Sequence, residues 1–188
     1  MSFAIWFRRR KLWGHFLRLL NETIRKIKEG SAEVSDEEMK SVTIELPVDA
    51  YIPSTYIADS KEKISAYQSL ASINSLEELK EAADDFSEEY GKIPLQVHTL
   101  FKIIELKIIA RRANILAIRS VPLTRTEREV HLLLGKKVGA SEIMNLLKEQ
   151  EKWFVSSDRL KIPLKELGMD FLAEIKKALL LLGAGKKS

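Results

Sequence analysis

Residues 94–113 read PLQVHTLFKIIELKIIARRA, and apolar side chains cover most of the circumference of the helix that this stretch predicts. Its first residue, Pro94, suits the first turn of a helix. The apolar surface is interrupted by a narrow polar strip: His98, Lys102, Glu105 and Arg112. Because a helix that is apolar almost all round needs cover on several sides, we expect this stretch to form the central core helix of a small domain. We expect His98 to be a partly exposed structural histidine and not a catalytic base.

Two more helices are predicted directly ahead of this one. Asp59, with a glutamate three residues later, is typical of a capping box and opens a helix that runs to about residue 72. Ser75, with a glutamate at the same spacing, opens a second helix that runs to about residue 90 and stops at Gly91. Helix signals are therefore dense over residues 59–113.

Strand signals flank the helical group. Residues 41–46 alternate, with Val42, Ile44 and Leu46 on one side. The later segments predict strands over 116–123 and 129–134, a short helix over 141–150, a hairpin of 153–155 with 159–162, and a closing helix over 170–182. We therefore expect an α/β fold, a small mixed-sheet domain with several packed helices, over residues 41–188.

A separate helix is predicted near the amino terminus. Over residues 11–29 one apolar face is formed by Phe16, Leu20, Ile24 and Ile27, and Gly30 ends the helix. The polar, acidic residues 31–40 follow as a linker. The sequence therefore predicts two parts, a detached basic helix with its linker over 1–40 and the domain over 41–188.

The composition excludes several function classes. The chain has no cysteine, so disulfides, iron–sulfur clusters and thiol nucleophiles are excluded, and its three histidines are widely spaced. It has no glycine-rich phosphate loop and no Gly-x-Ser-x-Gly motif. The apolar run over 178–182 falls far short of the roughly 20 residues that a membrane span needs. We expect no catalytic residues, no metal, no cofactor, no membrane contact and a cytoplasmic location.

Charge is distributed unevenly along the chain. Residues 1–30 carry eight Lys or Arg against two Asp or Glu, residues 31–90 carry four against fifteen, and residues 91–188 carry nineteen against ten. Opposed blocks of this kind indicate internal pairing or separate docking faces. The basic residues 8–11 lie among aromatic side chains, so a small basic nucleic-acid-binding module that uses 1–30 and 91–188 is an alternative function.

The acidic charge is concentrated on the predicted helix over 76–90. Carboxylates four residues apart repel one another, which disfavours this helix by a few tenths of a kcal/mol for each pair. Glu88 and Glu89 disfavour it further, because they lie in the last turn, where the helix dipole opposes negative charge. One interpretation is a solvated face, or pairing with Arg111 and Arg112. The other is a docking face for a basic partner.

Several stretches together point to a known family. Residues 14–24 read GHFLRLLNETI, residues 44–53 read IELPVDAYIP, residues 90–94 read YGKIP and residues 106–115 read LKIIARRANI. In this order and spacing the first resembles the helix that leads out of the translocase module of bacterial transcription-repair coupling factors (Mfd). The others resemble the carboxy-terminal TRCF domain of that family.

The resemblance implies a regulatory role. In the family this domain packs on the UvrB-like amino-terminal module, hides the UvrA-binding surface and restrains an ATP-driven DNA translocase. The ATPase motifs are absent from this chain, so RNA polymerase and DNA would be reached only through the parent protein, and UvrA only indirectly. The family's docking face includes the acidic helix before the aromatic-Gly-x-x-Pro turn. The candidate docking residues here are Glu81, Asp84, Asp85, Glu88 and Glu89.

Overall fold

A computed structural model of the protein describes residues 42–148, 150 and 152–184; the expected helix over 11–29, the linker over 31–40 and the basic residues 8–11 lie outside this part. The elements follow one another as β1 (Thr43–Glu45), α2 (Ser60–Ser72), α3 (Leu76–Tyr90), α4 (Leu95–Arg112), β2 (Ile115–Pro122), β3 (Arg128–Leu134), α5 (Ala140–Lys148), β4 (Phe154–Ser156), β5 (Arg159–Pro163), the 3₁₀ helix η2 (Leu164–Leu167) and α6 (Phe171–Gly183). None of the described helices is long and apolar enough to cross a bilayer.

The strands form one mixed sheet in the order β1-β2-β3-β5-β4. β1 runs parallel to β2, and the remaining neighbours are antiparallel. The register aligns Ile118 of β2 with Leu132 of β3, and Leu132 with Leu160 of β5. All three side chains are fully buried, so one face of the sheet carries the core. The predicted α/β class is confirmed.

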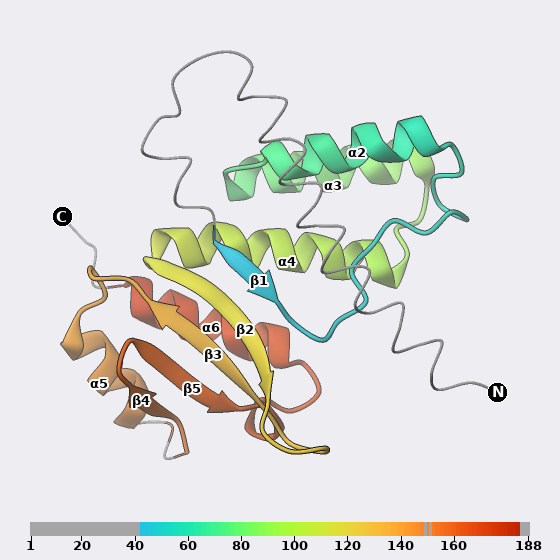
Figure 1. Cartoon of the computed structure of the whole chain (residues 1–188). Coiled ribbons are helices and arrows are strands. Elements are labelled where there is room, and N and C mark those ends of the chain that lie inside the picture. The colour runs from blue at the N-terminus through green and yellow to red at the C-terminus, as the bar shows by residue number, and fades with distance from the viewer. Residues whose placement is uncertain (1–41, 149, 151, 185–188) are drawn as a thin grey trace, which may run out of the picture. The chain divides into compact units, whose positions relative to one another are not determined.

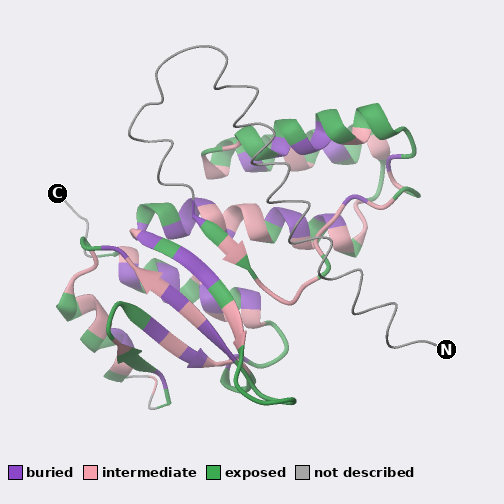
Figure 2. Ribbon diagram, viewed as in Figure 1, coloured by how far each residue is buried: buried purple, intermediate pink, exposed green. Residues whose placement is uncertain are grey.

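The helices are arranged in two groups. α4 and α6 pack on the core face of the sheet, whereas α2 and α3 lie together on the side of α4 that faces away from the sheet (Figure 1). α4 is therefore covered on both sides, and purple buried stretches recur along it, while α2 and α3 are green over much of their outer surface (Figure 2). This arrangement leaves one long side of α3 in solvent.

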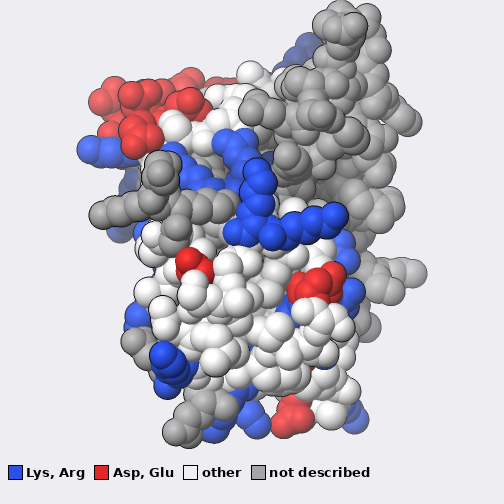
Figure 3. Space-filling view, turned by 90° about the vertical axis from the view of Figure 1, so that its left-hand side faces the viewer, with Lys and Arg blue, Asp and Glu red and all other residues white. Residues whose placement is uncertain are grey.

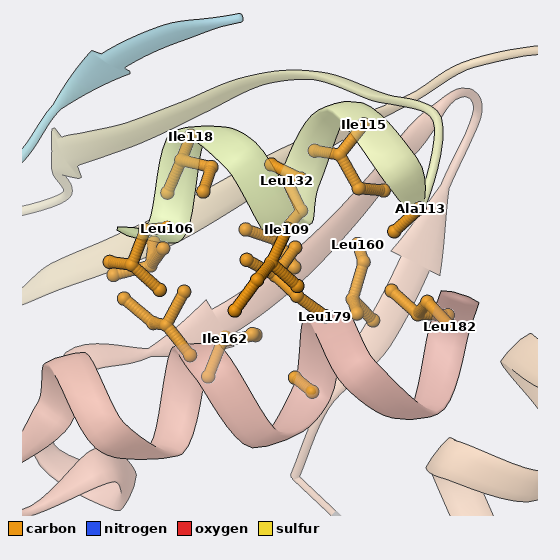
Figure 4. Packing of buried hydrophobic residues seen from close by; sticks show 14 of the residues in the cluster. Leu106, Ile109, Ala113, Ile115, Ile118, Leu132, Leu160, Ile162, Leu179 and Leu182 are labelled. Atoms are coloured by element: carbon orange, nitrogen blue, oxygen red, sulfur yellow. The ribbon is translucent and has the colours of Figure 1, made fainter. Parts of the chain in front are cut away.

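The burial of α4 confirms the predicted central core helix. Leu106 and Ile109 reach toward the sheet and α6, where they meet Ile118 and Leu179 (Figure 4). On the other side Phe101 contacts Phe86 of α3 edge-on, with 5.5 Å between ring centroids. Each such buried side chain contributes about 1.5–3 kcal/mol relative to an exposed one.

The reversal from α4 into β2 depends on a close backbone approach. Asn114 ends the helix with φ at 58°, in the left-handed region that asparagine tolerates better than most residues. Its carbonyl accepts a hydrogen bond of 2.8 Å from the amide of Gly135 at the end of β3. A Cβ at Gly135 would lie 2.6 Å from that same oxygen, so only glycine fits.

Some boundaries differ from those expected. Pro94 precedes α4 as its N-cap, one position before the first turn where the sequence predicts it. The predicted strands shift by about one residue at either end. The 3₁₀ helix η2 was not predicted, because four residues after a proline carry no periodic signal.

Candidate docking face

The start of α3 is fixed by side chains around its first turn. The amide of Glu78 donates to Ser75 Oγ at 3.1 Å, as the capping box predicts. The carboxylate of Glu78 accepts from the amide of Asn74 at 2.8 Å, one residue before the usual partner. The acidic side chains of this turn also suit the positive end of the helix dipole.

The two sides of α3 differ completely in character. Leu79 and Phe86 are buried against the rest of the domain, with Leu76, Ala83 and Tyr90 partly buried beside them. At 100° per residue, a stripe of carboxylates runs along the opposite side of the helix. This acidic stripe consists of Glu77, Glu81, Asp84, Asp85 and Glu88, all exposed. Its length from the first to the last member is about 16 Å, at about 1.5 Å per residue.

The structure brings four of the five predicted docking residues into this stripe. Glu81, Asp84, Asp85 and Glu88 share it, whereas Glu89 is exposed but turned toward the side of the helix, next to Tyr90. Partial burial, together with the neighbouring carboxylates of Glu62 and Glu89, raises the pKa of Tyr90. Red acidic side chains gather at the upper left of Figure 3, at the height of α2 and α3 in Figure 1.

The acidic stripe has no cationic partner among the described residues. The ion pairs found within the described ranges join other side chains, such as Lys176 with Glu105 at 2.6 Å. Arg111, one of the two arginines considered for pairing with the stripe, instead donates to Asn74 Oδ1 and O at 2.9 and 3.0 Å. Arg111 therefore holds the loop before α3 and does not neutralise the carboxylates.

The carboxyl end of α3 is held by aromatic residues. The Tyr56 hydroxyl donates to the carbonyl oxygen of Phe86 at 2.8 Å and lies 3.3 Å from that of Gly91. Tyr90 Oη lies 3.1 Å from Glu62 Oε1 and so ties α3 to α2. Gly91 has φ at 77° and ψ at −151°, a conformation that favours glycine, and the helix ends there as the sequence predicts. The last turn of α3 is thus anchored from the β1–α2 segment and from α2.

The other candidate groups show no reactive arrangement. His98, which the sequence predicts to be partly exposed, is exposed on α4. His131 Nε2 lies 2.8 Å from Glu129 Oε2 on β3, where both side chains are largely buried. Within the described ranges, no three His, Asp or Glu side chains are placed to hold a metal ion.

One family model and several known proteins are similar to this chain. The TRCF domain family model matches residues 46–132. The chain carries a TRCF domain. The transcription-repair-coupling factor of Bacillus subtilis (strain 168) is 31% identical over 157 residues, which cover 81% of this chain and 13% of that protein. That of Mycobacterium bovis is 30% identical over 105 residues, which cover 56% of this chain and 8% of that protein.

A solved structure supports the fold. The crystal structure of the C-terminal domain of transcription-repair coupling factor superposes with a TM-score of 0.63 at 19% identity, covering 78% of this chain and 96% of that one. The curated relatives are several times longer than this TRCF-domain chain, which spans about an eighth or less of their length.

Two residues of the site were not predicted from the sequence. Tyr56 lies 30 residues before Phe86, so no local spacing links its hydroxyl to α3. Glu77 is not among the predicted docking residues, although the helical period places it in the same stripe. A helical-wheel projection anchored on Leu79 and Phe86 reveals Glu77, whereas nothing in the sequence reveals Tyr56.

Proposed function

We propose that this TRCF-domain chain is a regulatory, autoinhibitory docking domain of a transcription-coupled repair translocase. Its acidic stripe binds a basic surface on the UvrB-like module of the parent protein and so masks the UvrA-binding surface of that module. UvrA is affected only indirectly, and RNA polymerase and DNA are reached only through the parent. The chain itself carries out no catalysis, and it acts in the cytoplasm.

The observation that supports this proposal most strongly is that the acidic stripe pairs with no cation among residues 42–148, 150 and 152–184. Exposed carboxylates contribute little to stability, and carboxylates four residues apart repel one another by a few tenths of a kcal/mol. The stripe is therefore not a device for stabilising α3. A partner that supplies arginine removes the repulsion and gains charge-assisted hydrogen bonds, which are about twice as strong as neutral ones.

The position of the stripe also favours docking. It lies opposite Leu79 and Phe86, so a partner can cover it without disturbing the contacts that hold α3 to α4. The ends of α3 are fixed by Ser75 at one end and Tyr56 at the other. A rigid helix loses little conformational freedom when it binds, which favours affinity.

A binding experiment with charge reversal tests the proposal. The probe is the purified UvrB-like module of the B. subtilis relative, titrated onto the chain at several salt concentrations. Asp85→Lys with Glu88→Lys should abolish detectable binding. The matched control, Asp49→Lys with Asp158→Lys, makes the same change in net charge at exposed positions outside α3 and should bind like the unaltered chain. Equal loss in both double variants would show only a net-charge effect and would refute the docking face.

A further inference from the structure

The last turn of α3 has few favourable electrostatic contacts of its own. It contains no basic residue, and Glu88 and Glu89 place negative charge at the negative end of the helix dipole. The last carbonyl groups of any helix also lack partners within the helix. A donor from elsewhere in the fold would therefore stabilise this turn.

Tyr56 supplies such a donor from the segment between β1 and α2. Its hydroxyl donates to the Phe86 carbonyl at 2.8 Å, and the Gly91 carbonyl lies 3.3 Å from the same oxygen. Its ring packs against that of Tyr90, with 5.6 Å between centroids. Partial burial raises the pKa of Tyr56, so the hydroxyl keeps the proton that it donates.

We propose that Tyr56 is a positioning residue of the docking face, because its hydroxyl fixes the helical turn that presents Asp85 and Glu88. This inference rests on the function proposed above and names a residue outside α3 on which that function depends. Asp85 precedes Phe86 directly, and Glu88 lies between the two carbonyls that Tyr56 contacts. Without the hydroxyl, binding would have to order this turn and would lose affinity accordingly.

The test compares Tyr56→Phe with Tyr67→Phe in the full chain. Both variants keep the aromatic ring and lose one hydroxyl that bonds to the backbone, but the Tyr67 hydroxyl accepts from the amide of Ile52, which lies outside α3. Two measurements are made on each variant. One is hydrogen exchange of the Gly91 amide, which donates to Ser87 at 3.0 Å. The other is affinity for the same UvrB-like module across a salt series.

The expected result has three parts. Tyr56→Phe should speed exchange of the Gly91 amide and weaken binding about two- to tenfold, the range set by one hydrogen bond. The dependence of its affinity on salt should not change, because every charge of the stripe remains. Tyr67→Phe should leave both the Gly91 exchange and the affinity unchanged.

The alternative results separate the two proposals. If charge reversal at Asp85 and Glu88 abolishes binding while Tyr56→Phe binds normally, the positioning role is refuted and the docking face stands. If Tyr56→Phe weakens binding without faster exchange at Gly91, or if Tyr67→Phe weakens it equally, the positioning role is also refuted. If neither Tyr56→Phe nor charge reversal changes binding, both proposals are refuted.

Discussion

The guanidinium of Arg111 donates two hydrogen bonds to Asn74, which lies two residues before α3 begins. Nη1 donates to the side-chain oxygen of Asn74 at 2.9 Å, and Nη2 donates to its backbone carbonyl oxygen at 3.0 Å. The carboxyl end of α4 is thereby fastened to the loop that starts the acidic helix. The two bonds leave from one planar group, a geometry that the ammonium group of lysine cannot reproduce.

Removal of these two hydrogen bonds should destabilise the domain modestly. We expect Arg111→Ala to lower the free energy of unfolding by about 1 kcal/mol, the net value of a partly exposed hydrogen-bonded pair. Arg111→Lys should restore little of it. Urea denaturation of the three proteins measures this effect, and full recovery with lysine would show that charge and not the paired hydrogen bonds matters.

The core makes a stronger prediction. Leu106 is 1% exposed between the sheet and α6, so Leu106→Ala should cost about 2–5 kcal/mol through lost burial and the cavity left behind. His98→Ala, on the exposed strip of the same helix, should change stability by less than about 0.5 kcal/mol. Thermal unfolding of both variants compares the two sides of α4, and similar losses would contradict its role as the core helix.

Sequence patterns predicted the local structure well where the signal is local. An apolar surface over most of its circumference identified α4 as the core helix, and Ser75 and Gly91 marked the ends of α3. Pairing across the sheet was not predictable in detail. Ile44 of β1 is paired with Ile118 of the parallel strand β2, more than 70 residues later in the chain. No pattern in the sequence indicates such a pair.

The candidate site shows the same division. The acidic stripe follows from helical geometry once the buried side of α3 is known. The contacts that hold the stripe in place do not follow from helical geometry, because they are hydrogen bonds between residues far apart in the sequence. Glu62, for example, fits a local capping box by spacing, yet its carboxylate is bonded to Tyr90 of the next helix. The chemistry of a surface was therefore readable from the sequence, whereas what holds that surface in place was not.

Stability at high pH should depend on Tyr67. Burial raises the pKa of Tyr67 from 10.0 to about 12, so the folded protein resists ionisation more than the unfolded chain does. The corresponding stability is fully present below pH 10 and is lost as the pH rises from 10 to 12. Burial also raises the pKa of Tyr56, so its ionisation adds to the loss of stability with rising pH.

Urea denaturation between pH 9 and 12 measures this loss. Tyr67→Phe should give a shallower decline of stability with pH, even though it lowers stability at every pH by leaving the Ile52 amide without its acceptor. The slope and not the absolute stability is diagnostic. An unchanged slope would mean that Tyr67 ionises equally in the folded and unfolded states.

The proposed division of the chain near residue 40 gives a further prediction. A chain that begins at Ser41 should unfold cooperatively, because the described core is built from residue 42 onward. Circular dichroism during heating measures this. A broad transition without a cooperative step would show that residues 1–40 are integral to the domain.

The central claim, masking of a UvrA-binding surface, is tested most directly in a full-length protein. Residues 41–188 of this chain replace the C-terminal domain of the B. subtilis relative, and the affinity of the chimera for UvrA is measured with and without Asp85→Lys and Glu88→Lys. A chimera that lacks the domain gives the unmasked affinity. We predict weak UvrA binding by the unaltered chimera and at least about tenfold tighter binding after charge reversal, since loss of close interfacial charge pairs commonly costs more than 1.4 kcal/mol. If the unaltered and charge-reversed chimeras bind UvrA equally, the acidic stripe does not mask that surface.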